Sequence, residues 1–360
     1  MATVSCREGD QRRIPIDIAL RDAAGYARWQ AKLRRLVAMS EAELAAIDIA
    51  RLNMFCAAGL PGTERIDPAA CITTLDGWSE YIRRNVERWW PGFLEAPRPG
   101  EESPGKFRMM AIATLLVRQL GVRYNLRFAQ GDYDARDCSN LFLHGLLIGA
   151  GGTCVTMPVL YIAIARRLGY PVFLVKTRDH YFARWDEPGV ERFNVECTCP
   201  GFFSPSDEYY CNWPSRVTEA DLWHGVLLRN LGRREEFACF LCERGNCLLD
   251  HLRIPEALEA YCNAHKILPR DGGIEGKWIA ASILYRAFLM AQRGADTKRT
   301  RMIAIEEMEY PAPSNDKEAW AIPYAKEILA RVLRISGKGD AAARTHSALH
   351  RNELPAKTRR

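Results

Sequence analysis

The chain has 360 residues, and 48% of them are hydrophobic, which is enough for two domains or for one domain with a substantial appendage. Lys and Arg exceed Asp and Glu by 50 to 44, and this surplus is spread along the chain, so it does not predict a nucleic-acid partner. The sequence has no run of eighteen apolar residues to predict a membrane span, and its N-terminal stretch lacks the apolar segment of a secretory signal. We therefore expect a cytoplasmic protein.

Helical spacing of apolar residues dominates the first 150 positions. It predicts five helices: "IDIALRDAAGYARWQAKLRRLVAM" (16–39), "SEAELAAIDIARLNMFCAAG" (40–59), "LDGWSEYIRRNVERWW" (75–90), "GKFRMMAIATLLVRQLG" (105–121) and "SNLFLHGLLIGA" (139–150). Ser40 and Glu43 form a capping box for the second helix, and Gly59 ends it. The Pro- and Gly-rich stretch "PGFLEAPRPGEESPG" (91–105) predicts a linker or a long loop.

An apolar helix over 158–169 is followed by the densest strand pattern of the chain. The segments "PVFLVK" (171–176), "HYFARW" (180–185) and "ERFNVECT" (191–198) are rich in aromatic and β-branched residues, and "DEPGV" between the last two predicts a turn. The order predicted is therefore a buried helix followed by an antiparallel meander.

Helical spacing returns after about residue 236, with one good match to a tetratricopeptide repeat. Gly245, Ala257, Tyr261, Ala264 and Pro269 have the separations of that repeat, in which small residues let two helices cross closely. A weaker match to the same repeat, "EILARVLRISGKGDAAARTHSAL" (327–349), lies near the C-terminus. The alternative is an ordinary helical hairpin.

Twelve cysteines without an export signal indicate free thiols rather than a disulfide framework. The run "CFLCERGNCLLDH" superficially suggests a zinc site made of Cys239, Cys242, Cys247 and His251. Its spacing is helical, however, and places Cys247 away from the face that Cys239 and Cys242 share, which is poor geometry for a tetrahedral cage. We expect these cysteines to pack in a core, and we expect no metal or organic cofactor.

The stretch "GAGGTCVTMP" places Cys154 where a thiol can act as a nucleophile. Pro158 has no N–H and so fits only in the first turn of a helix, which puts the helix start within a turn of Cys154. A helix N-terminus lowers the pKa of a nearby thiol, and a neighbouring imidazole lowers it further. Gly151 and Gly152 leave room for a substrate backbone and for main-chain N–H groups that could face an oxyanion.

The predicted hairpin supplies a base and a carboxylate. If Trp185 and Glu191 close a five-residue loop, His180 lies opposite Glu196, with Cβ atoms about 5 Å apart. A carboxylate there fixes the imidazole tautomer and stabilises an imidazolium. A register shift of two places Asn194 opposite His180 instead, so Asn194 is the alternative third member.

Each residue considered alone has a structural interpretation. Free cysteine is among the most buried residue types, and single histidines such as His144 in "NLFLHGLL" usually pack in a core. A cysteine at a helix start, a histidine opening a strand and a carboxylate one hairpin away are together less easily explained by chance. The combination therefore favours a catalytic triad of Cys154, His180 and Glu196.

The segments "LFLHGLLIGAGGTCVTMPVLYIAIARRLGYPVFLV", "HYFARW", "RFNVECT" and "DEYYCNWP" resemble the transglutaminase-like superfamily, a circularly rearranged relative of papain-like cysteine proteases. They look most like a bacterial group with tetratricopeptide-type repeats after the core. The resemblance implies that Cys154 is the nucleophile, His180 the base and Glu196 the residue in the place usually held by Asp. Glutamate is one methylene longer than aspartate, which leaves Asn194 as the alternative orienting residue.

The resemblance and the patterns together predict an α+β protein. We expect a helical N-terminal region (1–103), a transglutaminase-like, papain-like core with a central helix packed on an antiparallel sheet (104–225), and tetratricopeptide-like hairpins (226–360). The function expected is cysteine-dependent acyl transfer on amide bonds through a thioester, with hydrolysis of a protein or peptide favoured over cross-linking, because the sequence identifies no site for a second-substrate lysine. The alternative is a non-catalytic scaffold that binds a peptide on its C-terminal repeats. No nucleic acid or membrane partner is expected.

Overall fold

The computed structural model describes residues 23–97, 103–129, 134–292, 300, 304 and 326–331. It divides into two compact units, Met1–Met39 and Ser40–Arg360. The described element of the first unit is helix α1 (Ala23–Ala38). The three-part division expected from the sequence, with boundaries at 103/104 and 225/226, stays a prediction.

The second unit is a mixed α+β structure, as predicted, with a small antiparallel sheet and many helices. The helices before the sheet are α2 (Glu41–Ala45), α3 (Ile49–Ala57), α4 (Pro68–Glu95), α5 (Pro104–Arg118), α6 (Leu126–Ala129), α7 (Leu143–Leu147) and α8 (Thr156–Arg167). Those after it are α9 (Asp207–Asn212), α10 (Glu219–Trp223), α11 (Arg233–Asp250), α12 (Ile254–Ile267) and α13 (Gly272–Gln292), and a short 3-10 turn spans Cys138–Asn140.

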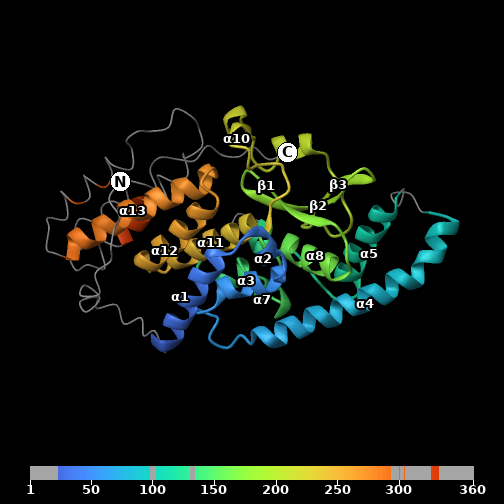
Figure 1. The fold of residues 1–360 in the computed structure, drawn as a ribbon, viewed down its shortest axis with the longest axis horizontal. Coiled ribbons are helices and arrows are strands. Elements are labelled where there is room, and N and C mark those ends of the chain that lie inside the picture. Colours follow the sequence, from blue (N-terminus) through green and yellow to red (C-terminus); the bar gives the residue numbers. More distant parts are fainter. Residues whose placement is uncertain are drawn as a thin grey trace. The chain divides into compact units, whose positions relative to one another are not determined.

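Helix α8 is the centre of the packing. Every residue from Thr156 to Ala165 is buried, and the helix contacts α3, α4, α5 and α7 as well as strands β1 (Val172–Thr177) and β2 (His180–Glu187) (Figure 1). A helix that is apolar all round is stable only when other elements surround it, as they do here. The predicted central helix on an antiparallel sheet is confirmed.

The sheet is the predicted meander, in the order β1-β2-β3, with β3 at Glu191–Val195. Thr177 pairs with His180, so β1 and β2 are joined by a two-residue turn in which Asp179 has a positive φ of 61°. Aspartate tolerates this left-handed conformation better than most residues. The turn therefore fixes where β2 starts, and β2 starts at His180.

Two helix predictions need correction. The helix expected over 40–59 is two helices, because Asp48 accepts hydrogen bonds from the N–H groups of Ala50 and Arg51 and so starts a new helix, α3. The capping box of Ser40 and Glu43 is confirmed at the start of α2. The helix expected over 139–150 is likewise broken, because the N–H of Leu143 bonds to the side chain of Asn53 rather than to a preceding turn.

The predicted linker over 91–105 is also partly wrong. Helix α4 begins earlier than expected, where Asp67 caps it, and continues through Pro91 to Glu95. Helix α5 begins within the same stretch, where the hydroxyl of Ser103 accepts the N–H of Lys106. Proline is disfavoured inside a helix but here does not end it.

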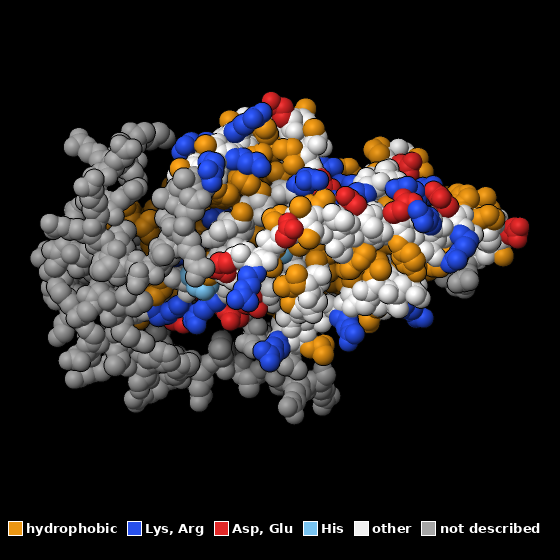
Figure 2. All heavy atoms as spheres, turned by 90° about the horizontal axis from the view of Figure 1, so that it is seen from below, with side chains coloured by type: hydrophobic (Ala, Val, Ile, Leu, Met, Phe, Trp, Pro, Cys, Tyr) orange, Lys and Arg blue, Asp and Glu red, His pale blue; other side chains and the backbone are white. Residues whose placement is uncertain are grey.

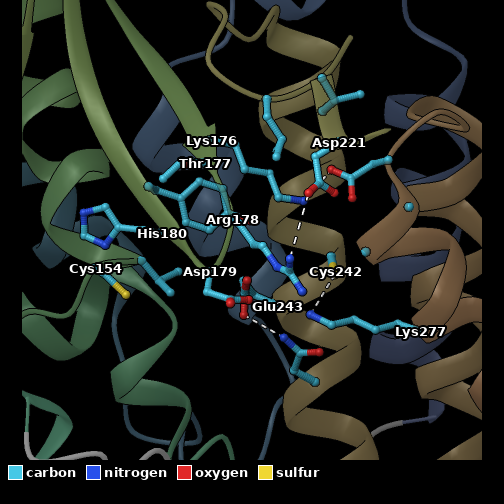
Figure 3. Close-up of a pocket in the computed structure, with 18 of the residues that line it drawn as sticks. Cys154, Lys176, Thr177, Arg178, Asp179, His180, Asp221, Cys242, Glu243 and Lys277 are labelled. Atoms are coloured by element: carbon cyan, nitrogen blue, oxygen red, sulfur yellow. Dashed lines mark hydrogen bonds and ion pairs between the residues drawn. The ribbon is translucent and has the colours of Figure 1, made fainter. Parts of the chain in front are cut away.

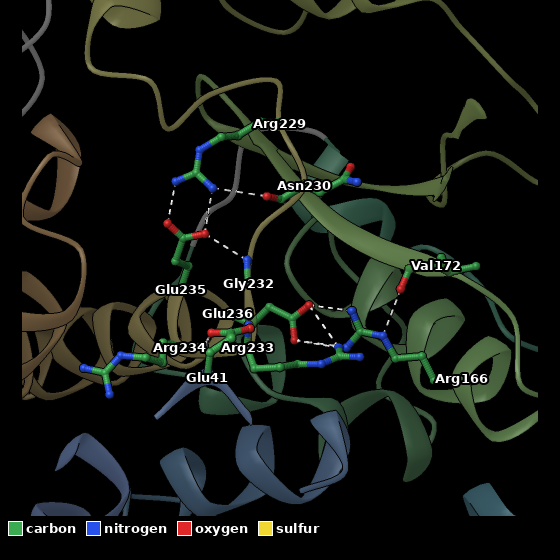
Figure 4. Close-up of polar contacts among 10 residues, drawn as sticks. All are labelled: Glu41, Arg166, Val172, Arg229, Asn230, Gly232, Arg233, Arg234, Glu235 and Glu236. Carbon is green, nitrogen blue, oxygen red and sulfur yellow. Dashed lines mark hydrogen bonds and ion pairs between the residues drawn. The ribbon is translucent and has the colours of Figure 1, made fainter. Parts of the chain in front are cut away.

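Polar contacts join the end of α8 to β1 and to α11 (Figure 4). The guanidinium of Arg166 donates two hydrogen bonds to Glu236, at 3.0 and 2.6 Å, and its Nε donates to the carbonyl of Val172 at 2.8 Å. The carboxylate of Glu41 accepts the backbone N–H of Arg234 at 3.0 Å, in the first turn of α11. A carboxylate is favourable at a helix N-terminus, so α11 has a fixed position against the core.

Helices α11 and α12 form the predicted hairpin and cross closely, and α12 contacts α13 (Figure 1). A Cβ atom built on Gly245 would lie 2.4 Å from the ring of Tyr261, so only glycine allows this approach. The assignment of the hairpin to tetratricopeptide repeats stays a prediction. Most of the weaker repeat match at 327–349 lies outside the described residues.

The surface of the described residues carries both signs of charge. On the face drawn in Figure 2, Lys and Arg side chains are interspersed with Asp and Glu side chains and with apolar ones. In the part of the chain that the structure describes, helices long and apolar enough to cross a membrane are absent.

Candidate active site

Cys154 lies in the turn that leads into the central helix, two residues before α8 begins at Thr156. The hydroxyl of Thr153 accepts the N–H groups of Val155 and Thr156 at 3.2 and 3.4 Å, and the hydroxyl of Thr156 accepts the N–H of Thr153 at 2.9 Å. The carbonyl of Thr153 accepts the N–H of Met157, which is the first bond of helical type. These reciprocal bonds hold Cys154 in the turn directly before α8, and Pro158 lies in the first turn of the helix, as predicted.

The backbone N–H of Gly152, the second glycine before Cys154, does not serve as an oxyanion donor. The N–H of Gly152 donates to the carbonyl of Arg123 at 2.8 Å, and the carbonyl of Gly152 accepts the N–H of Asn125 at 2.7 Å. A Cβ on Gly152 would lie 2.3 Å from the sulfur of Met157. The glycines therefore allow the segment around residue 124 to pack against the start of α8, which corrects one expectation from the sequence.

This packing brings Tyr124, which the sequence patterns did not single out, next to Cys154. Burial raises the pKa of the Tyr124 hydroxyl, the adjacent thiol raises it further, and the backbone N–H of Cys154 lowers it. The hydroxyl of Tyr124 is therefore close to both the thiol and the backbone of Cys154. The pairing of Tyr124 with Gly152, which creates this proximity, joins segments about 30 residues apart in a way that no local pattern signals.

His180 and Glu196 are in contact. The Nε2 atom of His180 and the Oε2 atom of Glu196 are 2.8 Å apart, and the two side chains are 3% and 1% exposed. The second oxygen of Glu196, Oε1, accepts the N–H of Thr198 at 2.8 Å and its hydroxyl at 2.6 Å. Burial acts to raise the pKa of Glu196, but the hydrogen bonds from His180 and Thr198 outweigh it and hold that pKa below its ordinary value.

The hairpin register that led to this pair was nevertheless wrong. Glu187 pairs with Glu191 around a three-residue loop. The sequence predicts instead that Trp185 pairs with Glu191 around a five-residue loop. Gly189, with φ 75°, supplies the left-handed residue that a three-residue hairpin loop requires. A shift of two residues keeps every side chain on its face of the sheet, so Glu196 reaches His180 diagonally instead of directly across. Its additional methylene, compared with aspartate, suits this longer reach.

Asn194, the alternative third member, is directed elsewhere. Its Oδ1 accepts Nε of Arg184 at 2.7 Å, and its Nδ2 donates to Asp207 at 2.8 Å and to the carbonyl of Pro205 at 3.0 Å. Arg184 is fully buried and also forms an ion pair with Asp207. These contacts use the whole side-chain amide of Asn194, and none of them involves His180.

Cys154 and His180 line one cavity of about 430 Å³, a size typical of small-molecule sites. Figure 3 shows the two side chains at one end of it and Lys277 at the other, with Arg178, Asp179 and Glu243 between them. Among the hydrogen bonds of the described residues, none joins the thiol to the imidazole. Such contacts are often loose without substrate and tighten when it binds.

The thiol of Cys154 is not activated in the resting structure. Burial raises its pKa to about 12, and the charges of Glu243, Glu196 and Asp179 add to that increase, while its own backbone N–H lowers it. The sequence predicts a lowered pKa for this thiol, from the helix start and a neighbouring imidazole. Desolvation and three carboxylates outweigh that effect, which is a property of the tertiary structure.

The cysteines of the run 239–251 make separate contacts from α11. The thiol of Cys242 contacts the ammonium group of Lys277, and the thiol of Cys247 faces the carbonyl of Arg136. The described residues include no cluster of three or more His, Cys, Asp and Glu residues that could hold a metal ion.

Comparison with known proteins agrees with part of the expected resemblance. Residues 72–211 match the family model described as "Transglutaminase-like superfamily", so this part of the chain is a transglutaminase-like superfamily domain. The match contains Cys154, His180 and Glu196. The superfamily is mostly enzymatic and includes inactive members.

Two curated proteins share a shorter stretch with the chain. F-box only protein 21 from Homo sapiens and from Pongo abelii are each 37% identical to it over 60 residues, which is 17% of this chain and 10% of each of those proteins. The chain thus matches about a tenth of the length of these relatives. No solved structure matches it. The bacterial group and the repeats expected from the sequence stay predictions.

Proposed function

We propose that the protein is a cysteine-dependent acyl-transfer enzyme that acts on amide bonds, with Cys154 as nucleophile, His180 as base and Glu196 as the residue that orients His180. The observation that carries the proposal is the buried 2.8 Å contact between His180 and Glu196, at the wall of the cavity that Cys154 also lines. A nucleophile and an oriented base that face one cavity form the minimal arrangement for covalent acyl transfer.

The contact between Nε2 and Glu196 supports different roles for the two imidazole nitrogens. Because Nε2 donates to Glu196, Nδ1 is the nitrogen available to take a proton from Cys154. The sulfur then attacks the amide carbonyl carbon, and the tetrahedral intermediate collapses as His180 returns the proton to the leaving amine. The product is a thioester on Cys154 and a free amine. Attack by water, or by a second amine, releases the acyl group and restores the thiol.

The raised pKa of Cys154 defines when the proton moves. A thiol with a pKa of about 12 is protonated at neutral pH, so His180 removes the proton during the attack rather than before it. This differs from a preformed thiolate–imidazolium pair. The reaction needs no metal or organic cofactor. We propose a protein or peptide substrate and favour hydrolysis over cross-linking, in a cytoplasmic setting.

An activated ester tests the proposal without knowledge of the natural substrate. We expect p-nitrophenyl acetate to acetylate Cys154, which mass spectrometry of the digested protein would locate, and hydroxylamine to remove the acetyl group as a hydroxamate. Cys211, which is half-buried outside the cavity, is the control thiol. Equal acetylation of Cys154 and Cys211, or no acetylation of Cys154, would contradict the proposed nucleophile.

A non-catalytic scaffold is the second candidate. It is supported by the close helical crossing at Gly245 and Tyr261, which resembles the peptide-binding hairpins of repeat proteins. An inert Cys154 together with a protein partner captured equally by the unaltered protein and by Cys154→Ala would favour this function.

A further inference from the structure

Tyr210 shares a carboxylate oxygen with His180. Its hydroxyl donates to Oε2 of Glu196 at 2.9 Å, and the same oxygen lies 2.8 Å from Nε2 of His180. Together with the two bonds from Thr198 to Oε1, the carboxylate takes part in four hydrogen bonds. Glu196 is 1% exposed, so water has little access to either oxygen. The protein alone therefore decides how this carboxylate is oriented.

The tyrosine is itself rigidly held. Its ring stacks on Phe182, with ring centroids 3.7 Å apart and planes 2° from parallel, and its carbonyl accepts the hydroxyl of Thr177 at 2.9 Å. Val175, Phe182 and Tyr210 form one buried apolar cluster. A donor on a ring fixed at both ends can restrain the group that it binds.

We propose that Tyr210 is a positioning residue: its hydroxyl holds the Glu196 carboxylate so that Nε2 of His180 keeps its proton and Nδ1 stays free to act as the base. The inference rests on the proposed function. Glutamate has one more rotatable bond than aspartate, and so needs more contacts to hold its carboxylate in one place. Tyr210 and Thr198 supply those contacts from α9 and from the end of the hairpin.

The adjacent residue offers a matched control. Tyr209 lies on the same short helix, and its ring contacts Phe203 and Trp213, but the hydrogen bonds of the described residues include none from its hydroxyl to Glu196. The variants Tyr210→Phe and Tyr209→Phe each remove one hydroxyl and keep the ring. Only the first removes a donor to Glu196.

Two measurements on the full chain test the role. The ¹⁵N chemical shifts of the His180 ring, assigned among the seven histidines with His180→Gln, report which nitrogen carries the proton. We expect Nε2 protonation in the unaltered protein, a mixture of tautomers in Tyr210→Phe, and no change in Tyr209→Phe. The rate of acetylation of Cys154 by p-nitrophenyl acetate should fall about three- to tenfold in Tyr210→Phe alone, the net effect of one ordinary hydrogen bond, because His180 and Thr198 still hold the carboxylate.

The inference is overturned if Tyr210→Phe matches Tyr209→Phe in the tautomer of His180, because a purely structural role would leave the tautomer unchanged. If Tyr210→Phe does not fold, Thr198→Val replaces it and Thr198→Ser, which keeps the hydroxyl, must restore both values. A tautomer shift in a protein whose Cys154 is not acetylated would reject the proposed function and retain the inference about His180. The two failures are therefore distinguishable.

Discussion

Within the described part of the chain, Cys138 with His144 and Cys154 with His180 are cysteine–histidine pairs with different surroundings, and only the second has the features of a candidate catalytic site. The Sγ atom of Cys138 lies 3.7 Å from Nε2 of His144, whereas the hydrogen bonds of the described residues include none between Cys154 and His180. Burial raises the pKa of Cys138 to about 12, the value also reached by Cys154. Neither proximity to histidine nor thiol pKa therefore separates the two pairs.

The two cysteine–histidine pairs differ in the surroundings of their histidines. Nδ1 of His144 is buried without a hydrogen-bond partner, and burial lowers the pKa of that ring. Nε2 of His180 instead contacts Glu196, and His180 lines a cavity together with Cys154, whereas Cys138 and His144 do not line it. A carboxylate behind the base and space in front of the thiol define the candidate site. The following predictions test this comparison.

The largest difference is expected from removing each thiol. Cys154→Ala should abolish formation of the thioester from p-nitrophenyl acetate, a fall of roughly 10³-fold or more, because no other group replaces the nucleophile. Cys138→Ala should leave the acylation rate unchanged in the folded protein. Mass spectrometry of the acetylated peptides measures both. Loss of acylation in a Cys138→Ala variant with a normal thermal unfolding temperature would contradict the assignment of the reactive thiol to Cys154.

Removing each histidine should give the next largest effect. His180→Ala should slow acylation of Cys154 by about 10²- to 10⁴-fold, the usual contribution of a positioned general base. His144→Ala should reduce stability but not the acylation rate, because His144 does not line the cavity. Stopped-flow release of p-nitrophenolate gives the rates. Equal effects of the two substitutions would show that the carboxylate behind His180 is not what distinguishes the pairs.

The carboxylate itself should matter less than the base. Glu196→Gln keeps a hydrogen-bond acceptor but removes the charge that stabilises the imidazolium, at a cost of about 1.5–3 kcal/mol or roughly 10- to 100-fold in the acylation rate.

Asn194→Ala provides the control at the alternative orienting position. It breaks the bonds to Arg184 and Asp207, and should lower the free energy of unfolding by about 1–3 kcal/mol without changing the rate. Urea unfolding and acylation kinetics of both variants are the measurements. A slower reaction in Asn194→Ala than in Glu196→Gln would assign the orienting role to Asn194.

The smallest effect is expected from the carboxylate whose charge most raises the pKa of the cysteine. After burial, Glu243 is the largest cause of the raised pKa of Cys154. Glu243→Gln keeps a carbonyl for the amide of Asn246 and removes the charge, so the pKa of Cys154 should fall. More of the thiol is then ionised at any pH below about 12, and alkylation of Cys154 by iodoacetamide should rise a few-fold at pH 8.

Asp179→Asn should also increase the alkylation rate of Cys154, but by less, because Asp179 raises the pKa of Cys154 less than Glu243 does. Cys138 is the internal control, because the carboxylates near it are Asp137 and Glu64, which these variants retain. Labelling of the two thiols is followed by mass spectrometry from pH 6 to pH 10. An unchanged rate at Cys154 would mean that burial alone sets its pKa.

Part of the site was predictable because it depends on local structure. Pro158 placed the helix start near Cys154, and the aromatic and β-branched pattern placed His180 at the start of a strand. The predicted register differs from the observed one by two residues, because the loop around Gly189 has three residues and not the five expected. Glu196 was still correctly paired with His180, since an even shift preserves the face of the sheet.

The sequence by itself determined the helix that begins beside Cys154, the three-stranded meander and the face that His180 and Glu196 share, because caps, turns and alternation are set by residues close in the chain. The tertiary structure alone decided that Gly152 packs against the segment of Tyr124, that Tyr210 meets Glu196, and that Cys154 and not Cys138 faces a cavity with an oriented base. These contacts and the raised pKa of Cys154 arise from burial and from charges on distant segments, which no local pattern encodes.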